Sequence, residues 1–216
     1  MKPVKHISST QNPEIRELIT IKEKKKGRSS SGLFVLEGIR EFDIAREAGS
    51  EFDKFFMCPD IISEELASEC AGHYPDVELI SVSKSVYERI AYRGKTEGWI
   101  ALAFAKDHSL TDLPPLSAQP LILVAESPEK PGNVGALLRT ADAAQLDAVL
   151  IADPISDLYN PNTVRSSVGC LFSVPIATAS SEDIIAFLKE RKISIFAATL
   201  QEAGNYVDRD YSGPTA

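Results

Sequence analysis

The chain has 216 residues, of which 44% are hydrophobic and 25% are charged, a balance typical of an ordinary folded protein. This composition disfavours disorder, collagen and coiled coil, and the length suffices to bury a core without disulfides or metals. Three cysteines without a C-x-x-C pair and three scattered histidines disfavour a zinc site and fit a reducing cytosol. No apolar run approaches about 18 residues, so we expect no membrane span, no export signal and a cytoplasmic location.

The charge is distributed unevenly along the chain. The net charge of −8, taken as a whole, argues against a nucleic-acid binder. Residues 1–28, however, carry eight Lys or Arg against three Glu, a balance of +5, so the remainder carries −13. A basic end on an acidic body indicates a localised docking surface for an anionic partner.

Residues 1–106 predict a small α/β domain. A helix from Pro13 to about Lys26 begins it, with Asn12 as its cap, and the basic stretch Lys24–Ser31 that ends it is expected to be a flexible loop. Short β-like runs then alternate with helical patterns. The strands are expected at Leu33–Leu36, Phe52–Met57, Val77–Val82 and Trp99–Phe104, and the helices at Ile39–Ala48, Ile61–Ala71 and Lys84–Ala91.

Residues 107–120 are rich in Pro and Ser without apolar periodicity and are interpreted as a linker. Residues 121–216 alternate apolar strand patterns with helical ones, which predicts a wound, mostly parallel sheet. The strands are expected at Leu121–Ala125, Ala148–Ala152, Val174–Ala177 and Ile193–Thr199, and the helices at Asn133–Ala144, Val164–Leu171 and Ser181–Arg191.

The segment Glu126–Ala143 follows a buried strand and opens a helix, which is where wound α/β sheets bind ligands. Gly132 and Gly135 permit close backbone approach, and Asn133 can cap a helix whose N-terminus attracts anions. The chain has no G-x-G-x-x-G after its first strand, no P-loop and no G-x-S-x-G elbow. These absences disfavour a dinucleotide fold, a P-loop enzyme and a hydrolase.

Arg139 lies on the same predicted helix, beside the packed stripe and off its centre. The stripe consists of Val134, Leu137, Leu138 and Ala141. Such an arginine is either a solvated surface residue or a functional group beside the ligand site.

The segment Glu126–Ala143, with its acid, Pro-Gly-Asn, Gly-Ala and Arg-Thr-Ala-Asp-Ala elements, resembles motif 1 of the SpoU (TrmH-like) RNA ribose methyltransferases of the SPOUT superfamily. Asn162–Pro175 is similar to the family's "vRaSaGalf-vP" segment. In the first half, Ser8–Pro13 resembles the "S-x-x-N-P" start of the family's substrate-binding domain, and Phe34–Arg40 resembles its "f-x-x-E-G-x-r" stretch. The resemblance covers nearly all of the chain.

The resemblance implies a homodimeric ribose 2′-O-methyltransferase with a knotted catalytic fold, which uses S-adenosylmethionine and acts on tRNA or rRNA. Asn133 and Arg139 match the functional pair of motif 1, in which the arginine is assigned the deprotonation of the 2′-hydroxyl. Because a guanidinium normally stays charged, orientation of the hydroxyl or phosphate and stabilisation of a developing alkoxide are alternative roles. Asn133 either positions Arg139 or caps the helix, and Glu126 is either an ion-pair partner of Arg139 or a strand-end carboxylate.

The chain departs from the family pattern at its C-terminal end. The family's G-x-E-x-x-G loop and terminal N-x-S-x-A-x-A helix, which help form the cofactor pocket and the knot, do not occur before Ala216. We therefore expect a C-terminally incomplete member that is inactive as it stands. Thr199 and Leu200, at the end of the last predicted strand, remain as an early wall of the cofactor site.

The basic stretch is the first candidate for RNA binding, since flexible lysines contact phosphates without reading sequence. The alternative is a solubilising helix end. The candidates are Lys24, Lys25, Lys26 and Arg28, with Arg40 and Arg93 as weaker ones.

Two other classes of function stay open from the sequence. A non-catalytic RNA-binding module would need only the basic end and the small first domain. An unrelated phosphate- or nucleotide-binding enzyme would use the helix start at Asn133. Cofactor binding separates the methyltransferase from both, and RNA binding separates these two from each other.

Overall fold

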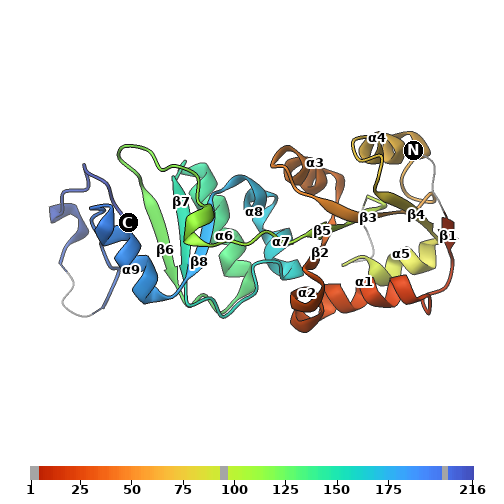
Figure 1. The fold of residues 1–216 in the computed structure, drawn as a ribbon, viewed down its shortest axis with the longest axis horizontal. Coiled ribbons are helices and arrows are strands. Elements are labelled where there is room, and N and C mark those ends of the chain that lie inside the picture. Colours follow the sequence, from red (N-terminus) through yellow and green to blue (C-terminus); the bar gives the residue numbers. More distant parts are fainter. Residues whose placement is uncertain (1–4, 93–96, 201–203) are drawn as a thin grey trace.

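The computed structural model describes residues 5–92, 97–200 and 204–216 and contains two β-sheets, one in each half of the chain (Figure 1). The N-terminal sheet has five strands in the order β1-β4-β3-β5-β2, in which β5 is antiparallel to both of its neighbours and the other pairs are parallel. Its strands are β1 (Lys5–Ile7), β2 (Leu33–Glu37), β3 (Phe52–Met57), β4 (Glu78–Val82) and β5 (Trp99–Phe104). The helices of this half are α1 (Pro13–Glu23), α2 (Lys25–Ser31), α3 (Ile39–Glu47), α4 (Glu64–Gly72) and α5 (Lys84–Ile90).

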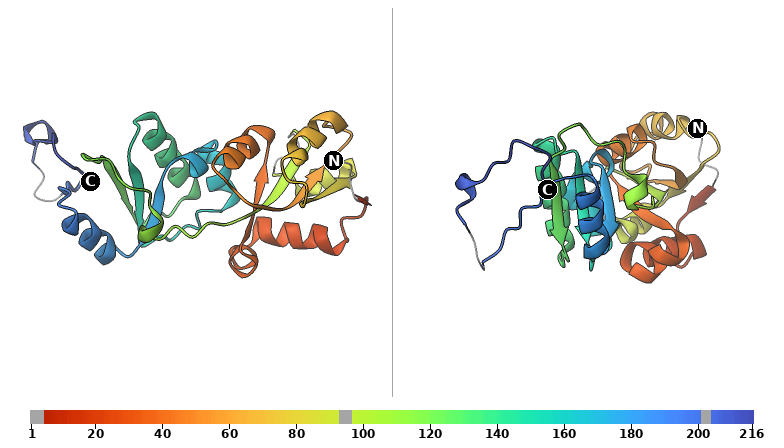
Figure 2. Two further views of the ribbon diagram at one scale, coloured as in Figure 1. Left: turned by 45° about the horizontal axis from the view of Figure 1, so that its top comes forward. Right: turned by 60° about the vertical axis from the view of Figure 1, so that its left-hand side comes forward.

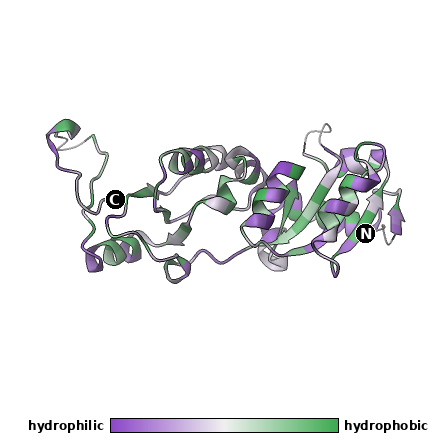
Figure 3. Ribbon diagram, turned by 90° about the horizontal axis from the view of Figure 1, so that it is seen from above, coloured by the Kyte–Doolittle hydropathy of each residue, from purple (hydrophilic) through white to green (hydrophobic). Residues whose placement is uncertain are grey.

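Strand alternation sorts this sheet's side chains between two cores. In β2, Phe34 and Leu36 belong to one buried cluster and Leu33 and Val35 to the other, as a period of two requires. Figure 3 shows hydrophobic residues along the strands and hydrophilic residues on the outer helix surfaces. The predicted alternation of strands and helices in this half is confirmed, with β1 as an addition that the sequence did not indicate.

The C-terminal sheet consists of three parallel strands in the order β6-β7-β8. They are β6 (Ile122–Glu126), β7 (Ala148–Ala152) and β8 (Ile176–Ala179). The accompanying helices are α6 (Pro131–Ala143), α7 (Pro161–Ser167), α8 (Cys170–Ser173) and α9 (Ser181–Glu190), and short 3-10 turns lie at Leu110–Asp112 and Tyr206–Asp208. The predicted α/β class with a mostly parallel sheet is confirmed, whereas the trefoil knot stays a prediction.

The basic stretch after α1 is helical, which corrects the predicted flexible loop. Lys24 has an extended conformation and separates α1 from α2, which ends at Gly32 in the left-handed region. Gly27 permits this turn, because a Cβ there would lie only 2.6 Å from the carbonyl oxygen of Thr20. The hydroxyls of Ser30 and Ser31 donate to the Gly27 carbonyl and further fix α2.

Two other elements differ from expectation. The helix predicted over Val164–Leu171 is divided into α7 and α8 by Val168 and Gly169, both with positive φ, where Gly169 packs directly on Ile44 of α3. The strand predicted over Ile193–Thr199 is absent: only Ser194 forms an isolated bridge, to Thr215, which in turn bridges Leu121. Ser194 and Phe196 instead hydrogen-bond to residues 214–216, which pair with the chain at Pro120 and Ile122. The described residues between these two segments extend away from the sheet as a loop (Figure 2).

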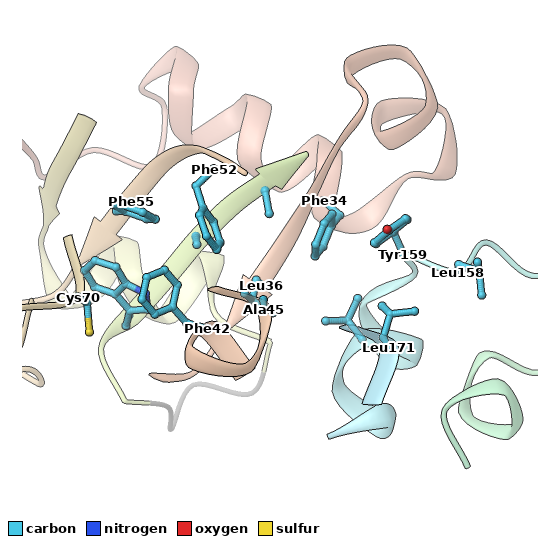
Figure 4. Packing of buried hydrophobic residues seen from close by; sticks show 14 of the residues in the cluster. Phe34, Leu36, Phe42, Ala45, Phe52, Phe55, Cys70, Leu158, Tyr159 and Leu171 are labelled. Carbon is cyan, nitrogen blue, oxygen red and sulfur yellow. The ribbon is translucent and has the colours of Figure 1, made fainter. Parts of the chain in front are cut away.

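The two halves share one buried core. Phe34 of β2 packs against Tyr159, which follows β7, with ring centroids 4.4 Å apart and the rings tilted by 31°, and Leu171 of α8 belongs to the same cluster (Figure 4). A salt bridge of 2.5 Å joins Arg28 of α2 to Asp157 of the β7–α7 loop. The N-terminal helices are therefore fixed against the loops of the C-terminal sheet. None of the helices within the described ranges has the length and apolar character needed to cross a membrane.

Candidate functional site

The carboxyl ends of β6, β7 and β8 meet at one edge of the C-terminal sheet. Glu126 pairs with Ala152, and Ala152 with Ala179, so the three strands end in register. The next residues, Ser127 and Asp153, both have φ near +45° and donate their N–H groups to Ala152 and Ala179 respectively. The loops that follow β6 and β7 therefore begin at positions fixed by backbone hydrogen bonds, as expected at a ligand-binding edge.

Asn133 does not cap α6, which corrects one of its predicted roles. The helix begins at Pro131, its N-cap is Lys130, and no side chain of the described residues accepts a capping hydrogen bond there. Proline at the first position removes one of the donors that a cap would have satisfied. Asn133 is an exposed residue of the first turn, beside backbone donors and the positive end of the helix dipole.

Arg139 is exposed on α6, and its guanidinium Nη1 donates to the backbone carbonyl of Ser166 on α7. It is therefore anchored at the contact between two helices, unlike a freely solvated arginine. A guanidinium has five donors, so this contact leaves others for a ligand. No ion pair joins Glu126 to Arg139 within the described residues, and Glu126 is an exposed carboxylate at the end of β6.

Gly135 serves the packing of α6 on α7. An added Cβ would collide with the Ser166 side chain and would lie 2.7 Å from the Ser166 carbonyl carbon and the Ser167 nitrogen. Gly132, by contrast, has only the Asn162 amide nitrogen within 4 Å, at 3.6 Å. Gly135 thus brings the Ser166 carbonyl within reach of Arg139, while the space at Gly132 remains open.

The structure separates the residues predicted to bind RNA into exposed side chains and a buried one. Lys24, Lys25 and Lys26 are exposed at the start of α2, and Arg40 is exposed on α3. Arg28 is only 6% exposed and donates to Asp157 and to the carbonyl oxygens at the end of α1, so it is a structural residue and the prediction of a flexible phosphate contact is wrong. Arg93 lies outside the described residues.

The residues predicted to hold the cofactor do not form a wall. Thr199 and Leu200 are exposed in the extended segment after α9, and the Leu200 side chain is fully exposed at 101%. The prediction depended on a strand over Ile193–Thr199 that would end at the same sheet edge as the start of the Asn133 helix. Because that strand is absent, these two residues do not line a cavity with α6.

Asp157 and Ser166 have roles that sequence reasoning missed. Asp157 accepts a hydrogen bond from the Tyr159 N–H as well as the salt bridge from Arg28, and Ser166 holds Arg139 through its backbone. A backbone acceptor leaves no signal in a sequence. The signal for Asp157 is limited to its place in a loop at the carboxyl end of a predicted strand.

Two thiols, of Cys70 on α4 in the N-terminal half and of Cys170 on α8, do not indicate nucleophilic chemistry. Burial raises the pKa of the Cys70 thiol to about 11, and burial together with the charge of Asp142 raises the pKa of Cys170. A thiol with a raised pKa is a poor nucleophile near neutrality. Across the described ranges, no group of three or more His, Cys, Asp or Glu is arranged to hold a metal ion.

Comparisons with known protein families match both halves of the chain. Residues 120–216 match the SpoU rRNA methylase family, and residues 12–101 match the MRM3-like substrate-binding domain. Among curated relatives, a 23S rRNA (guanosine(2553)-2′-O)-methyltransferase, RlmP, of Bacillus subtilis is 25% identical over 203 residues, which cover 94% of this chain and 77% of the relative.

Solved structures share the same fold. An RNA 2′-O-ribose methyltransferase is 34% identical with a TM-score of 0.80, covering 97% of this chain and 79% of that one. The SpoU methyltransferase AviRb from Streptomyces viridochromogenes, solved with AdoMet, is 21% identical with a TM-score of 0.83, covering 95% and 79%. These matches span both sheets and the α6–α7 site together. This chain belongs to the SpoU rRNA methylase family.

Proposed function

We propose that the protein transfers a methyl group from S-adenosylmethionine to a ribose 2′-hydroxyl of RNA, with ribosomal RNA as the substrate class. The observation that carries the proposal is the position of Arg139, which is exposed beside the ligand-binding edge of a parallel sheet and anchored by the Ser166 carbonyl. Relatives that match across nearly the whole chain are named as 23S rRNA 2′-O-methyltransferases, which supports ribosomal RNA over transfer RNA.

The chemistry of an arginine limits the role of Arg139. Its guanidinium stays protonated in proteins, so it acts as a fixed positive charge and hydrogen-bond donor. Such a group orients the 2′-hydroxyl and stabilises the negative charge that develops on its oxygen as the proton leaves to a base or to solvent. That charge is then neutralised as the oxygen bonds to the methyl carbon and the sulfur departs as the neutral thioether. The anchor to Ser166 keeps this charge in place before the RNA arrives.

Asn133 acts on a different atom of the substrate. It lies six residues before Arg139, and at 100° per residue the two side chains leave α6 about 120° apart. We therefore assign Asn133 to a phosphate or ribose oxygen near the first turn of α6, where backbone N–H groups and the helix dipole also favour an anion. The two residues together are proposed as the catalytic pair.

S-adenosylmethionine supplies the electrophilic methyl group in this reaction. The residues that we expected to hold it, Thr199 and Leu200, do not fit that task in this structure, because both are exposed and no strand brings them to α6. We therefore assign no residue of this chain to the cofactor and confine the proposal to the RNA side of the site.

RNA docking is proposed for the N-terminal half. Residues 1–106 would bind substrate, 107–120 would connect, and 121–216 would carry the methyltransferase site. Three exposed lysines, Lys24, Lys25 and Lys26, lie at the start of a helix that Arg28 fixes to the C-terminal half, and Arg40 and Arg93 stay weaker candidates. The homodimer that the resemblance implies, and the cytoplasmic location expected from the cysteine usage and the N-terminal sequence, are part of this proposal.

A methyl-transfer assay on ribosomal RNA with radiolabelled S-adenosylmethionine tests the proposal in a protein that also carries the family's G-x-E-x-x-G loop and terminal helix. Arg139→Ala should slow transfer by about 100-fold or more, the scale of losing one key transition-state contact. Arg191→Ala, at the far end of α9, is the matched control and should leave the rate unchanged. Equal rates for Arg139→Ala and the parent would refute the role of Arg139. RNA binding without any methyl transfer would instead support a non-catalytic RNA-binding module.

A further inference from the structure

A small cavity lies where the N-terminal sheet meets α7. Its volume is about 240 Å³, below the roughly 300–1,000 Å³ of clefts that take drug-sized ligands. We call it the Tyr92 pocket. The residues that matter to its chemistry are Glu37, Glu41, Tyr92, Glu97, Val164 and Arg165.

An aromatic ring and a guanidinium face each other at this pocket. The Arg165 guanidinium carbon lies 5.5 Å from the centre of the Tyr92 ring, within the range of a cation–π contact. Both side chains are exposed, Tyr92 by 40%. Tyrosine rings and arginine planes are the surfaces on which proteins stack the unpaired bases of RNA.

The charge of the pocket disfavours a phosphate, because its three carboxylates outnumber its two cations, Lys22 and Arg165. Three carboxylates line it, from Glu37, Glu41 and Glu97, and like charge repels the backbone of RNA. The Lys22 ammonium does not offer a phosphate a donor, because it already donates to the carbonyl oxygens of Arg89, Ile90 and Ala91. An uncharged ligand with its own N–H donors fits this environment better.

The carboxylates have acceptor capacity to spare. One oxygen of Glu37 accepts the Tyr92 N–H at 2.7 Å, and one oxygen of Glu97 accepts the Ile39 N–H at 2.5 Å. An ionised carboxylate offers about four acceptor sites, so both can accept further hydrogen bonds. Amino and imino groups on the edges of nucleobases are donors of this kind.

We propose that the Tyr92 pocket takes one unstacked base of single-stranded RNA, which stacks on Tyr92 and Arg165 and donates hydrogen bonds to the carboxylates. The proposal rests on the proposed function for the identity of the ligand as RNA. It also connects the pocket to the reaction site, because Arg165 immediately precedes Ser166, whose carbonyl anchors Arg139. A base bound in this pocket fixes the position of the RNA relative to α7 and therefore relative to Arg139.

Fluorescence of a short single-stranded RNA with one 2-aminopurine, moved through successive positions, tests the proposal directly, because stacking quenches this base. The parent protein should quench it at one position. Tyr92→Ala should abolish the quenching and weaken binding by about fivefold or more, the lower end of the effect of removing one stacked base. Tyr92→Phe keeps the ring and should behave as the parent, and Tyr206→Ala, an exposed tyrosine far from the pocket, is the matched control.

Circular dichroism spectra and the melting temperature of each variant show whether it folds, and so separate loss of stacking from loss of fold. If Tyr92→Ala does not fold, Arg165→Met, which keeps an unbranched side chain but removes the guanidinium plane, should reduce the quenching in its place. Quenching and affinity equal to the parent in the variant that folds would overturn the proposal. If the parent transfers methyl groups but never quenches the probe, the proposed base-binding pocket is contradicted and the proposed function stands. If the parent quenches the probe but transfers no methyl group, the proposed function is contradicted and the base-binding pocket stands.

Discussion

Gly135 shows how one residue without a side chain places another. In the sequence it looks like a position for close approach of a ligand to the backbone, yet the structure fills the space above it with Ser166 and Ser167 of α7. The close crossing of α6 and α7 at this point is what brings the Ser166 carbonyl to Arg139. The glycine thus contributes to the site through packing.

A pair of substitutions tests this interpretation. Gly135→Ala should lower the free energy of unfolding by about 1–3 kcal/mol, because the added methyl overpacks the α6–α7 contact. Gly132→Ala, in the same helix, meets nothing closer than 3.6 Å and should be neutral or stabilising by up to about 1 kcal/mol, since alanine favours helix. Urea titration of both variants measures the difference. Equal stabilities would show that the crossing relaxes freely and that Gly135 does not fix Arg139.

Among the elements, α2 illustrates how neighbouring residues of one type can differ in role. Four basic residues occur within Lys24–Arg28, and their composition gave no reason to separate them. Arg28 points inward because α2 is a helix and Asp157 lies beneath it, 129 positions further along the chain. The three lysines remain on the outer surface. The buried salt bridge therefore orients the exposed charges.

Substitution of the lysines tests their proposed contact with RNA phosphates. Lys24, Lys25 and Lys26 changed together to Gln should weaken binding and reduce the slope of log affinity against log salt by about 0.7 per lost contact with single-stranded RNA. Filter binding across a salt series measures the slope. The matched control changes Lys189 and Lys192, near the end of α9, to Gln and should leave the slope as it is. An unchanged slope in the triple variant would show that these lysines do not contact RNA phosphates and only form a solubilising helix end.

The elements predicted most accurately from the sequence are those whose apolar pattern is sufficient by itself. Phe52–Met57, Trp99–Phe104 and Ala148–Ala152 form strands with the expected bounds, because each is buried between helices or neighbouring strands. Ile193–Thr199 has a similar apolar pattern but lacks a full partner strand and stays extended. A strand depends on hydrogen bonds to a neighbour, which the pattern of one segment does not contain.

The position of the site in the sequence could be predicted more readily than the contacts among its residues. The segment after a buried strand and its family resemblance pointed to Asn133 and Arg139, and both are exposed on α6. The acceptor that holds Arg139 is a backbone carbonyl, and the partner of Arg28 is distant in the chain, so neither was visible. Such relations follow from tertiary packing, to which single-sequence patterns are blind.

On the scale of the whole molecule, the segment between the two sheets is held in place by hydrogen bonds to the C-terminal half. His108, in the segment between the two sheets, contacts the Tyr159 hydroxyl at 2.9 Å and the Ile176 carbonyl at 3.3 Å. The Tyr159 hydroxyl also accepts the Lys106 N–H, and the Tyr159 ring packs against Phe34. A neutral imidazole satisfies this arrangement, donating to Ile176 and accepting from Tyr159.

The stability of the protein should therefore depend on pH through His108. Burial lowers the pKa of His108 below its ordinary value of 6.5, so the unfolded chain takes up this proton at a higher pH than the folded chain does. The contribution to stability is complete above pH 6.5 and is lost as the pH falls below it. The melting temperature of the parent should accordingly fall between about pH 7 and pH 5, the range in which histidine titrates. His108→Gln should flatten this dependence, whereas His73→Gln, at an exposed histidine of the N-terminal half, should reproduce the slope of the parent. Parallel slopes in the parent and in His108→Gln would show that protonation of His108 does not act on the junction.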